Sequence, residues 1–163
     1  MSRIAKRQDA VKSPGSQKHI SQAGEVLTSL IVPVIRLEAY FSRAGETIAA
    51  AGGQTLARWL VLEAVADAPA TVAQIARGLG YTRQSVQRVA DLLEQDKLTH
   101  YALNPAHQRS QLVQITPLGR KNVSTIQRAQ RDWADRVGGQ IGEAELRQAG
   151  SVVDNLTRIL KAQ

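Results

Sequence analysis

A helical face crowded with arginine and glutamine occupies the stretch YTRQSVQRVADLLEQD, residues 81–96. At helical spacing, its outward residues are Thr82, Arg83, Gln84, Ser85, Gln87 and Arg88. Arginine presents paired donors that match guanine, glutamine matches adenine, and serine or threonine bonds bases or phosphate. No carboxylate precedes Asp91 in this stretch, whereas an ordinary exposed helix mixes glutamate with lysine. The pattern favours a helix that reads base edges, and the alternative is a solvated polar face.

The segment before this face predicts a helix-turn-helix unit. TVAQIARGLG, residues 71–80, opens with Thr71 and Gln74 at capping-box spacing, and Gly78 and Gly80 indicate a tight turn after it. Thr82 is suited to cap the next helix. The buried faces of the two helices are expected to consist of Val72, Ile75, Ala76 and Leu79, and of Val86, Val89, Ala90 and Leu93. A short helix, a glycine turn and a second amphipathic helix are typical of the helix-turn-helix motif.

A β-hairpin is expected after these helices. LTHYAL and QLVQIT read as strands joined by NPAHQRS, in which Asn104-Pro105 starts a turn. Arg109 near the tip is placed to enter the minor groove, where narrow A·T tracts concentrate negative potential, and the alternative is a solvated loop arginine. His107 is a further candidate for a phosphate contact, with plain polar surface as its alternative. The hairpin thus predicts the wing of a winged helix-turn-helix.

Helical patterns flank this lobe on both sides. Residues 26–48 carry apolar side chains at helical spacing until Gly52-Gly53, and Pro33 is expected to kink this helix or to mark its effective start. Thr55 is suited to cap a second helix, and Thr116-Pro117 to start a long polar helix. The last predicted helix, residues 143–160, carries a seam at spacings of three and four that consists of Leu146, Ala149, Val153, Leu156 and Leu160. This seam predicts a dimer interface, and the alternative is packing within one domain.

The amino-acid composition of the chain limits which classes of function we expect. The 163 residues carry a net charge of +7, and residues 1–20 hold five basic residues and one acidic residue. We interpret residues 1–20 as a disordered basic tail. The sequence lacks cysteine, and its three histidines have no metal-ligand spacing, so we expect no enzyme, no metal and no cofactor. No apolar run is long enough to span a membrane, which suggests a soluble, cytoplasmic protein.

The region TVAQIARGLGYTRQSVQRVADLLEQDKL, with NPAHQRSQLVQITPLGRK, resembles the MarR family of winged-helix transcription regulators. The similarity extends over about residues 21–162, since LARWLVLEAV and the helix order also match. It implies a homodimer on a pseudo-palindromic operator, usually a repressor relieved by a small aromatic or anionic ligand. By position, it places Thr82 to Arg88 on the recognition helix and Arg109 at the wing arginine.

The resemblance also implies an effector site near the junction of the dimer region and the DNA-binding lobe. Tyr40, Arg58 and Trp59 are its candidates, with core packing as the alternative for Trp59. Two positions depart from the family pattern. His107 replaces the wing aspartate that helps to hold the arginine, so Arg109 is expected to be less fixed. Asp96-Lys97 replaces a glycine, so Lys97 is expected in a left-handed conformation.

The expected fold class is mainly α with a small β-hairpin wing: a winged helix-turn-helix with an α-helical dimerisation region. Residues 21–163 are expected to form one domain, with 55–116 as the DNA-binding lobe and 21–51 and 117–163 as the dimerisation region. The leading hypothesis is a sequence-specific, dimeric, ligand-responsive regulator of transcription. A winged-helix module that binds protein, and a non-specific nucleic-acid binder that depends on the basic tail, are the alternatives.

Overall fold

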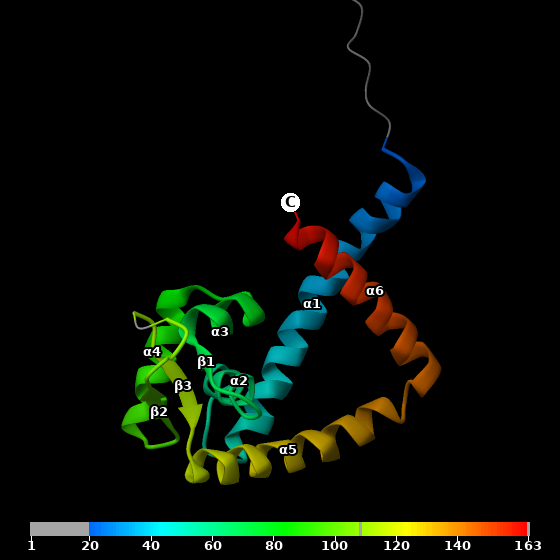
Figure 1. Cartoon of the computed structure of the whole chain (residues 1–163). Helices are drawn as coiled ribbons and strands as arrows, with labels where there is room; N and C mark the ends of the chain where they lie inside the picture. Colours follow the sequence, from blue (N-terminus) through cyan, green and yellow to red (C-terminus); the bar gives the residue numbers. More distant parts are fainter. Residues whose placement is uncertain (1–19, 108, 163) are drawn as a thin grey trace, which may run out of the picture. The chain divides into compact units, whose positions relative to one another are not determined.

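The computed structural model describes residues 20–107 and 109–162, so the predicted tail, apart from Ile20, and Gln108 lie outside the described residues. Its elements, in chain order, are α1 (Gln22–Ala50), α2 (Leu56–Ala64), β1 (Ala70–Thr71), α3 (Val72–Leu79), α4 (Arg83–Gln95), β2 (Thr99–Ala102), β3 (Leu112–Ile115), α5 (Pro117–Gly138) and α6 (Glu143–Lys161) (Figure 1). Internal contacts divide the chain between Glu38 and Ala39. The second unit, from Ala39 onward, contains the whole predicted DNA-binding lobe.

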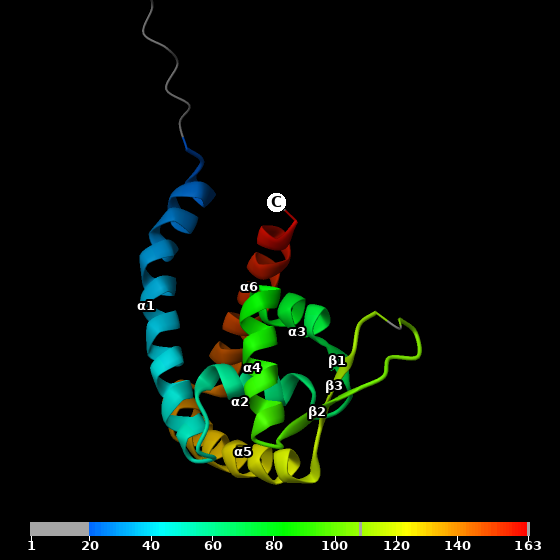
Figure 2. The same cartoon turned by 90° about the vertical axis from the view of Figure 1, so that its left-hand side faces the viewer.

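Threonine side chains start four of the helices. Thr55, Thr71, Thr82 and Thr116 each accept a hydrogen bond from the backbone N–H three residues later, as their positions in the sequence predict. Thr71 completes a capping box, because the Gln74 side chain accepts in return from the Thr71 backbone N–H at 2.8 Å. The helix-turn-helix of α3 and α4 is thus confirmed, and its two helices lie side by side (Figure 2).

The wing belongs to a three-stranded antiparallel sheet with the order β1-β3-β2. The predicted hairpin is confirmed, with Thr99 opposite Ile115 and Ala102 opposite Leu112. The expectation of a two-stranded wing was incomplete, since Ala70 also pairs with Val113. Two residues are too short for an alternating pattern, and their strand conformation depends on pairing with a distant segment. The connection between β2 and β3 projects beyond the sheet (Figure 2).

An aliphatic core holds the lobe together. Buried side chains from α2, α3, α4, the sheet and α5 form one cluster, which includes Leu62, Ile75, Leu93, Val113 and Val123. A second cluster joins the C-terminal part of α1 to α2 and α5 through Ile48, Ala49, Trp59 and Ile126. The cores leave the outward face of α4 uncovered, so its polar side chains reach solvent.

The end of α4 has the left-handed residue that the sequence predicts. Lys97 has a φ of 59°. Its N–H donates to the Glu94 carbonyl at 2.9 Å, and the N–H of Leu98 donates to the Leu93 carbonyl at 2.9 Å. These are the two bonds of a Schellman motif, and the buried side chains of Leu93 and Leu98 belong to the same core cluster. The turn therefore ends α4 and starts β2 without glycine.

The outer helices keep large apolar surfaces. α1 continues on both sides of Pro33, so the proline does not mark the start of the helix. α6 has no buried residue among its 19 residues. Of its predicted seam, Leu156 is half-buried, and Leu146, Ala149, Val153 and Leu160 are exposed. Within the described part of the chain, none of the helices combines the length and apolar character needed to cross a bilayer.

We expect Gly119→Ala to destabilise the fold. A Cβ at Gly119 would lie 2.1 Å from the carbonyl oxygen of Leu98 and 2.7 Å from the Ile115 side chain, so α5 would have to shift. Overpacking of this kind costs about 1–3 kcal/mol, which urea unfolding at neutral pH would measure.

Gly78→Ala is the matched control, because a Cβ at Gly78 meets no described atom within 4 Å. That change lies in α3 and should stabilise by up to about 1 kcal/mol through helix propensity. Equal stabilities of the two variants would contradict the close approach at Gly119.

Candidate nucleic-acid interface

The N-terminal turns of α4 present the predicted polar face to solvent. Thr82, Arg83, Gln84, Ser85, Gln87 and Arg88 are all exposed, while Val86 and Ala90 on the opposite face are buried. The Thr82 hydroxyl accepts from the Ser85 N–H at 3.1 Å, and the Ser85 hydroxyl donates to the Thr82 carbonyl at 2.9 Å. Since both hydroxyls already serve the cap, the arginines and glutamines carry most of the free hydrogen-bonding capacity of this face.

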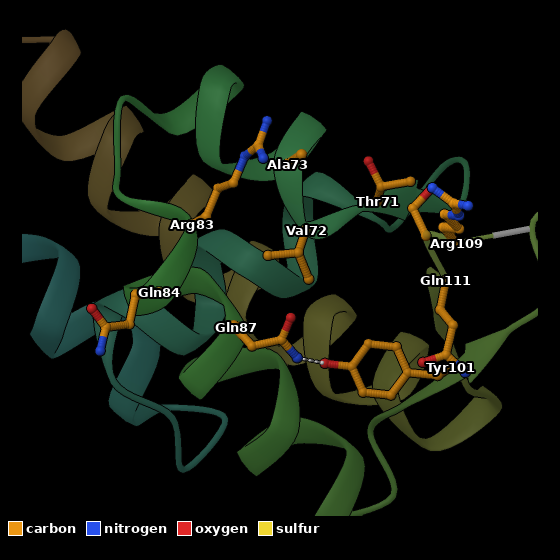
Figure 3. Close-up of a pocket in the computed structure, with 10 residues that line it drawn as sticks. Thr71, Val72, Ala73, Arg83, Gln84, Gln87, Tyr101, Arg109 and Gln111 are labelled. Atoms are coloured by element: carbon orange, nitrogen blue, oxygen red, sulfur yellow. Dashed lines mark hydrogen bonds between the residues drawn. The ribbon is translucent and has the colours of Figure 1, made fainter. Parts of the chain in front are cut away.

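An open hollow of about 480 Å³ lies beside this face (Figure 3). It is lined by residues from β1, α3, α4, β2 and the wing: Thr71, Val72, Ala73, Arg83, Gln84, Gln87, Tyr101, Arg109, Ser110 and Gln111. The structure therefore brings Arg109 of the wing to the same surface as Arg83 and Gln87 of α4. Gln84 points away from Tyr101 in the close-up (Figure 3). Thr82, Ser85, Arg88 and His107 are not among the lining residues.

Tyr101 on β2 is a site residue that sequence reasoning missed. Its hydroxyl donates to Asp91 Oδ1 at 2.6 Å and accepts from Gln87 Nε2 at 2.7 Å. Gln87 Nε2 also donates to Asp91 Oδ1 at 2.7 Å, which closes a triangle of three side chains. The sequence around Tyr101 does not predict this contact, because it forms only when β2 packs beside α4.

The environment of Tyr101 keeps its phenol protonated. Burial is the main cause that raises the pKa of Tyr101 well above its usual value. The hydrogen bond to Asp91 and the negative charges of Asp91 and Glu94 act in the same direction, while the bond from Gln87 acts against them. At neutral pH the hydroxyl is therefore a fixed donor to Asp91 and a fixed acceptor for Gln87.

A buried asparagine organises the wing. Asn104 Oδ1 accepts from the Ala106 N–H at 3.0 Å, and Asn104 Nδ2 donates to the Ser110 hydroxyl at 3.3 Å. The His107 N–H donates to the Asn104 carbonyl, so His107 contributes to the turn through its backbone while its side chain is exposed. Arg109 has no hydrogen bond or ion pair with any described residue. The looser arginine expected from the family pattern stays a prediction.

The three candidate effector residues do not form one site. The Arg58 guanidinium pairs with Asp96, and its Nε donates to Gln54 Oε1 at 2.6 Å, so it joins α2 to the end of α4. Trp59 is 7% exposed and packs in the second core cluster, as its alternative interpretation expected. Tyr40 is 67% exposed. Arg58 as a ligand contact therefore stays a prediction, and in this structure its partner is the carboxylate of Asp96.

Among residues 20–107 and 109–162, no group of three or more histidine, aspartate or glutamate side chains is arranged to hold a metal ion.

We expect the stabilising effect of Tyr101 to disappear at high pH. Its folded-state pKa lies above the ordinary value of 10.0, so the neutral phenol stabilises the fold fully below pH 10.0. This contribution is lost as the pH rises through the folded-state pKa. The difference in unfolding free energy between the wild type and Tyr101→Phe should therefore shrink above pH 10.0, as measured by urea unfolding.

Tyr81→Phe is the control for loss of a hydroxyl. Tyr81 is exposed, and its hydroxyl bonds no described residue. At neutral pH this change should cost less than Tyr101→Phe, which removes hydrogen bonds worth about 1 kcal/mol each. A wild-type advantage over Tyr101→Phe that grows with pH would contradict the assigned bonds.

Comparisons with known proteins agree with this arrangement. A family model described as the MarR family matches residues 53–110. An uncharacterised protein of Mycobacterium bovis is 35% identical over 137 residues, which cover 84% of this chain and 96% of that protein.

Two solved structures share the fold. One is a mutant MarR from E. coli in complex with operator DNA, with a TM-score of 0.72, 16% identity, and coverage of 84% of this chain and 99% of that chain. The other is Staphylococcus aureus MarR in complex with salicylate and kanamycin, with a TM-score of 0.74, 14% identity, and coverage of 87% and 97%. Members of this family are transcription regulators and not enzymes, in agreement with the sequence-based expectation. The chain belongs to the MarR family of transcription regulators.

Proposed function

We propose that this chain is a homodimeric, sequence-specific DNA-binding repressor that a small ligand releases from its operator. The observation that carries the DNA-binding part is the convergence of Arg83, Gln87 and Arg109 on one open hollow. These residues come from α4 and the wing, which are separate segments of the chain. The resemblance to the MarR family implies that the recognition helix contacts the major groove of DNA and that the wing contacts the minor groove.

The charge of this surface supports a polyanionic partner. Arg83 and Arg109 line the hollow, and its described lining includes no aspartate or glutamate. The nearby carboxylate of Asp91 is occupied by bonds from Gln87 and Tyr101. Phosphate contacts supply much of the affinity for DNA, and side chains on the recognition helix supply the sequence preference.

The apolar surfaces of the outer helices support a homodimer. On α6, Val153 is 59% exposed and Leu160 is 64% exposed, although both lie on the predicted seam. On α1, a run of apolar side chains that includes Leu30, Val34 and Leu37 is also exposed. Amphipathic helices bury such faces against another element, and a second copy of the chain offers the complementary seam. The two recognition helices would then read half-sites about 10 bp apart, or a multiple of that distance.

A second hollow in the unit that begins at Ala39 supports the ligand response. It measures about 320 Å³ and lies between the C-terminal part of α1 and α5. Trp133 and Arg136 line it and can contact an aromatic anion, and Asp132 lines it too. We place the effector here in preference to Arg58 and Trp59, which have other partners. The operator supplies the probe for a ligand screen in which release of DNA is the readout.

Selection from a random duplex library, with full-length protein at near-physiological salt, tests the DNA-binding proposal. We expect an enriched inverted repeat. Arg83→Ala should weaken binding to that repeat by about 5- to 150-fold, the range that a lost base contact implies. Arg128→Ala, which removes an exposed arginine of α5 outside the hollow, is the matched control and should have a smaller effect.

The alternatives make different predictions in the same experiment. A protein-binding module would enrich no sequence and would not respond to Arg83→Ala. A non-specific binder would retain DNA without enrichment and would lose it when residues 1–20 are deleted. Enrichment with equal losses for Arg83→Ala and Arg128→Ala would contradict the assignment of α4 as the reading helix.

The dimer proposal predicts that a charge on the seam separates the subunits. Val153→Asp should shift the protein from dimer to monomer, because it buries an unpaired carboxylate at an apolar interface. Sedimentation velocity or light scattering would measure the mass. Ser151→Asp introduces the same charge on an exposed position outside the seam and should leave the dimer intact. Dimers in both variants would exclude the seam as the interface.

A further inference from the structure

We propose that the open hollow between α4 and the wing holds one sugar–phosphate strand of DNA, and that Gln111 donates a hydrogen bond to a phosphate of that strand. Gln111 then contributes affinity for any duplex and no preference for a base sequence. This inference rests on the proposed DNA-binding function. It assigns an occupant to the hollow and adds a contact residue that neither the sequence patterns nor the family resemblance selected.

The geometry of the duplex determines what lies between the two reading elements. The proposed function places α4 in a major groove and Arg109 in a minor groove. Adjacent major and minor grooves of one duplex are separated by a sugar–phosphate strand. Arg83 and Gln87 of α4 line the hollow together with Arg109 of the wing, so the hollow lies between the two elements. The strand that separates the grooves therefore has to cross the hollow.

The charges around the hollow fit such a strand. In the close-up, Arg83 and Arg109 stand on opposite sides of it, with Val72 between them (Figure 3). Neither guanidinium has a hydrogen bond or ion pair with a described residue, so both are available to a partner. The described lining includes no aspartate or glutamate. A phosphate in the hollow would therefore be attracted from two sides and would meet no lining carboxylate.

Gln111 offers a neutral donor on the wing side of the hollow, between Arg109 and Tyr101 (Figure 3). Its side chain is exposed, and its amide has no hydrogen bond with any described residue. Glutamine is among the side chains that bind DNA phosphates. Gln111 directly precedes β3, so it lies nearer to the sheet than Arg109 does and is not part of α4. A phosphate between the grooves is therefore the partner that its position suits.

The backbone at Gln111 is held on both sides. The hydroxyl of the preceding Ser110 accepts from Asn104 Nδ2 at 3.3 Å. The following Leu112 begins β3, the central strand, and pairs with both β1 and β2. Little of the backbone has to be ordered when DNA binds, which favours a contact at this position.

Affinities of full-length variants for the selected operator and for a scrambled duplex test the assignment. Gln111→Ala should weaken binding to both duplexes by the same factor, about 2- to 10-fold, as the loss of one hydrogen bond implies. Arg83→Ala should lose more affinity for the operator than for the scrambled duplex. Gln114→Ala is the matched control, because it makes the same substitution on β3 outside the lining of the hollow, and it should leave both affinities unchanged.

Methylphosphonates in the operator locate the contact. Each one removes the negative charge of a single phosphate. At one position in each half-site, the replacement should weaken binding of the wild type and of Gln114→Ala equally. It should weaken binding of Gln111→Ala by a smaller factor, because that variant has already lost its contact with this phosphate.

A lysine at the same position tests the charge of the occupant. Each cation–phosphate contact adds about −0.9 to the slope of log affinity against log salt concentration. Gln111→Lys should therefore steepen the slope by about this amount, and Gln114→Lys should change it less.

Each outcome decides between the claims. If the wild type binds no DNA, the proposed function fails and this inference fails with it. If an inverted repeat is enriched but Gln111→Ala binds like Gln114→Ala, only the inference is overturned. A changed base preference in Gln111→Ala also overturns it, because Gln111 would then contact a base. If Gln111→Ala keeps its affinity for DNA but is no longer released by benzoate, a small aromatic anion, the hollow holds an effector in place of DNA and the inference is overturned.

Discussion

The carbonyl group of Leu98 is the point on which the DNA-binding lobe depends. It accepts from the Thr116 N–H at 3.0 Å and from the Thr116 hydroxyl at 3.1 Å. The same threonine caps α5 by accepting from the Gly119 N–H at 3.0 Å, and Gly119 packs directly against the Leu98 carbonyl. One backbone group thus joins the end of α4, the end of β3 and the start of α5. The left-handed conformation of Lys97 makes this junction possible, because it turns the chain so that Leu98 re-enters the core.

This junction holds the wing and α4 in a defined relation. β2 starts directly after Leu98. Tyr101 on this strand therefore lies beside α4, where its hydroxyl is within hydrogen-bond distance of Gln87 and Asp91. The Tyr101 N–H bond to Glu94 and the Arg58 pair with Asp96 add two further ties to the second half of α4. Among the described residues, Gln87 makes the only such tie in the first half of α4, whose buried Val86 packs in the core. The core and these ties hold the helix while the polar face of its N-terminal turns stays exposed.

The lobe buries its apolar side chains within one chain, whereas α1 and α6 leave many of theirs exposed. The lobe has its own aliphatic core and buried polar groups such as Asn104 that organise its loop. α6 has no buried residue, and of its predicted seam only Leu156 is half-buried while the other four residues are exposed. Such a division suits a molecule whose reading surface is formed within one subunit and whose spacing between two such surfaces depends on a partner. A ligand that alters this spacing would act on binding without touching the reading helix.

The sequence by itself determined the features that depend on local chemistry. Threonine caps, the capping box, the glycine turn and the apolar faces of α3 and α4 follow from spacing within a few residues. They were sufficient to predict the winged helix-turn-helix and the exposed polar face of α4. The left-handed Lys97 was expected from the family resemblance, in which a glycine follows this helix. Only the tertiary structure decided contacts between segments distant in sequence. These include the pairing of β1 with β3, the Arg58 pair with Asp96, and the bond of Tyr101 to Gln87. Such contacts depend on how elements pack in three dimensions, and neither the helical nor the strand periodicity of one segment records which side chain of another segment will face it.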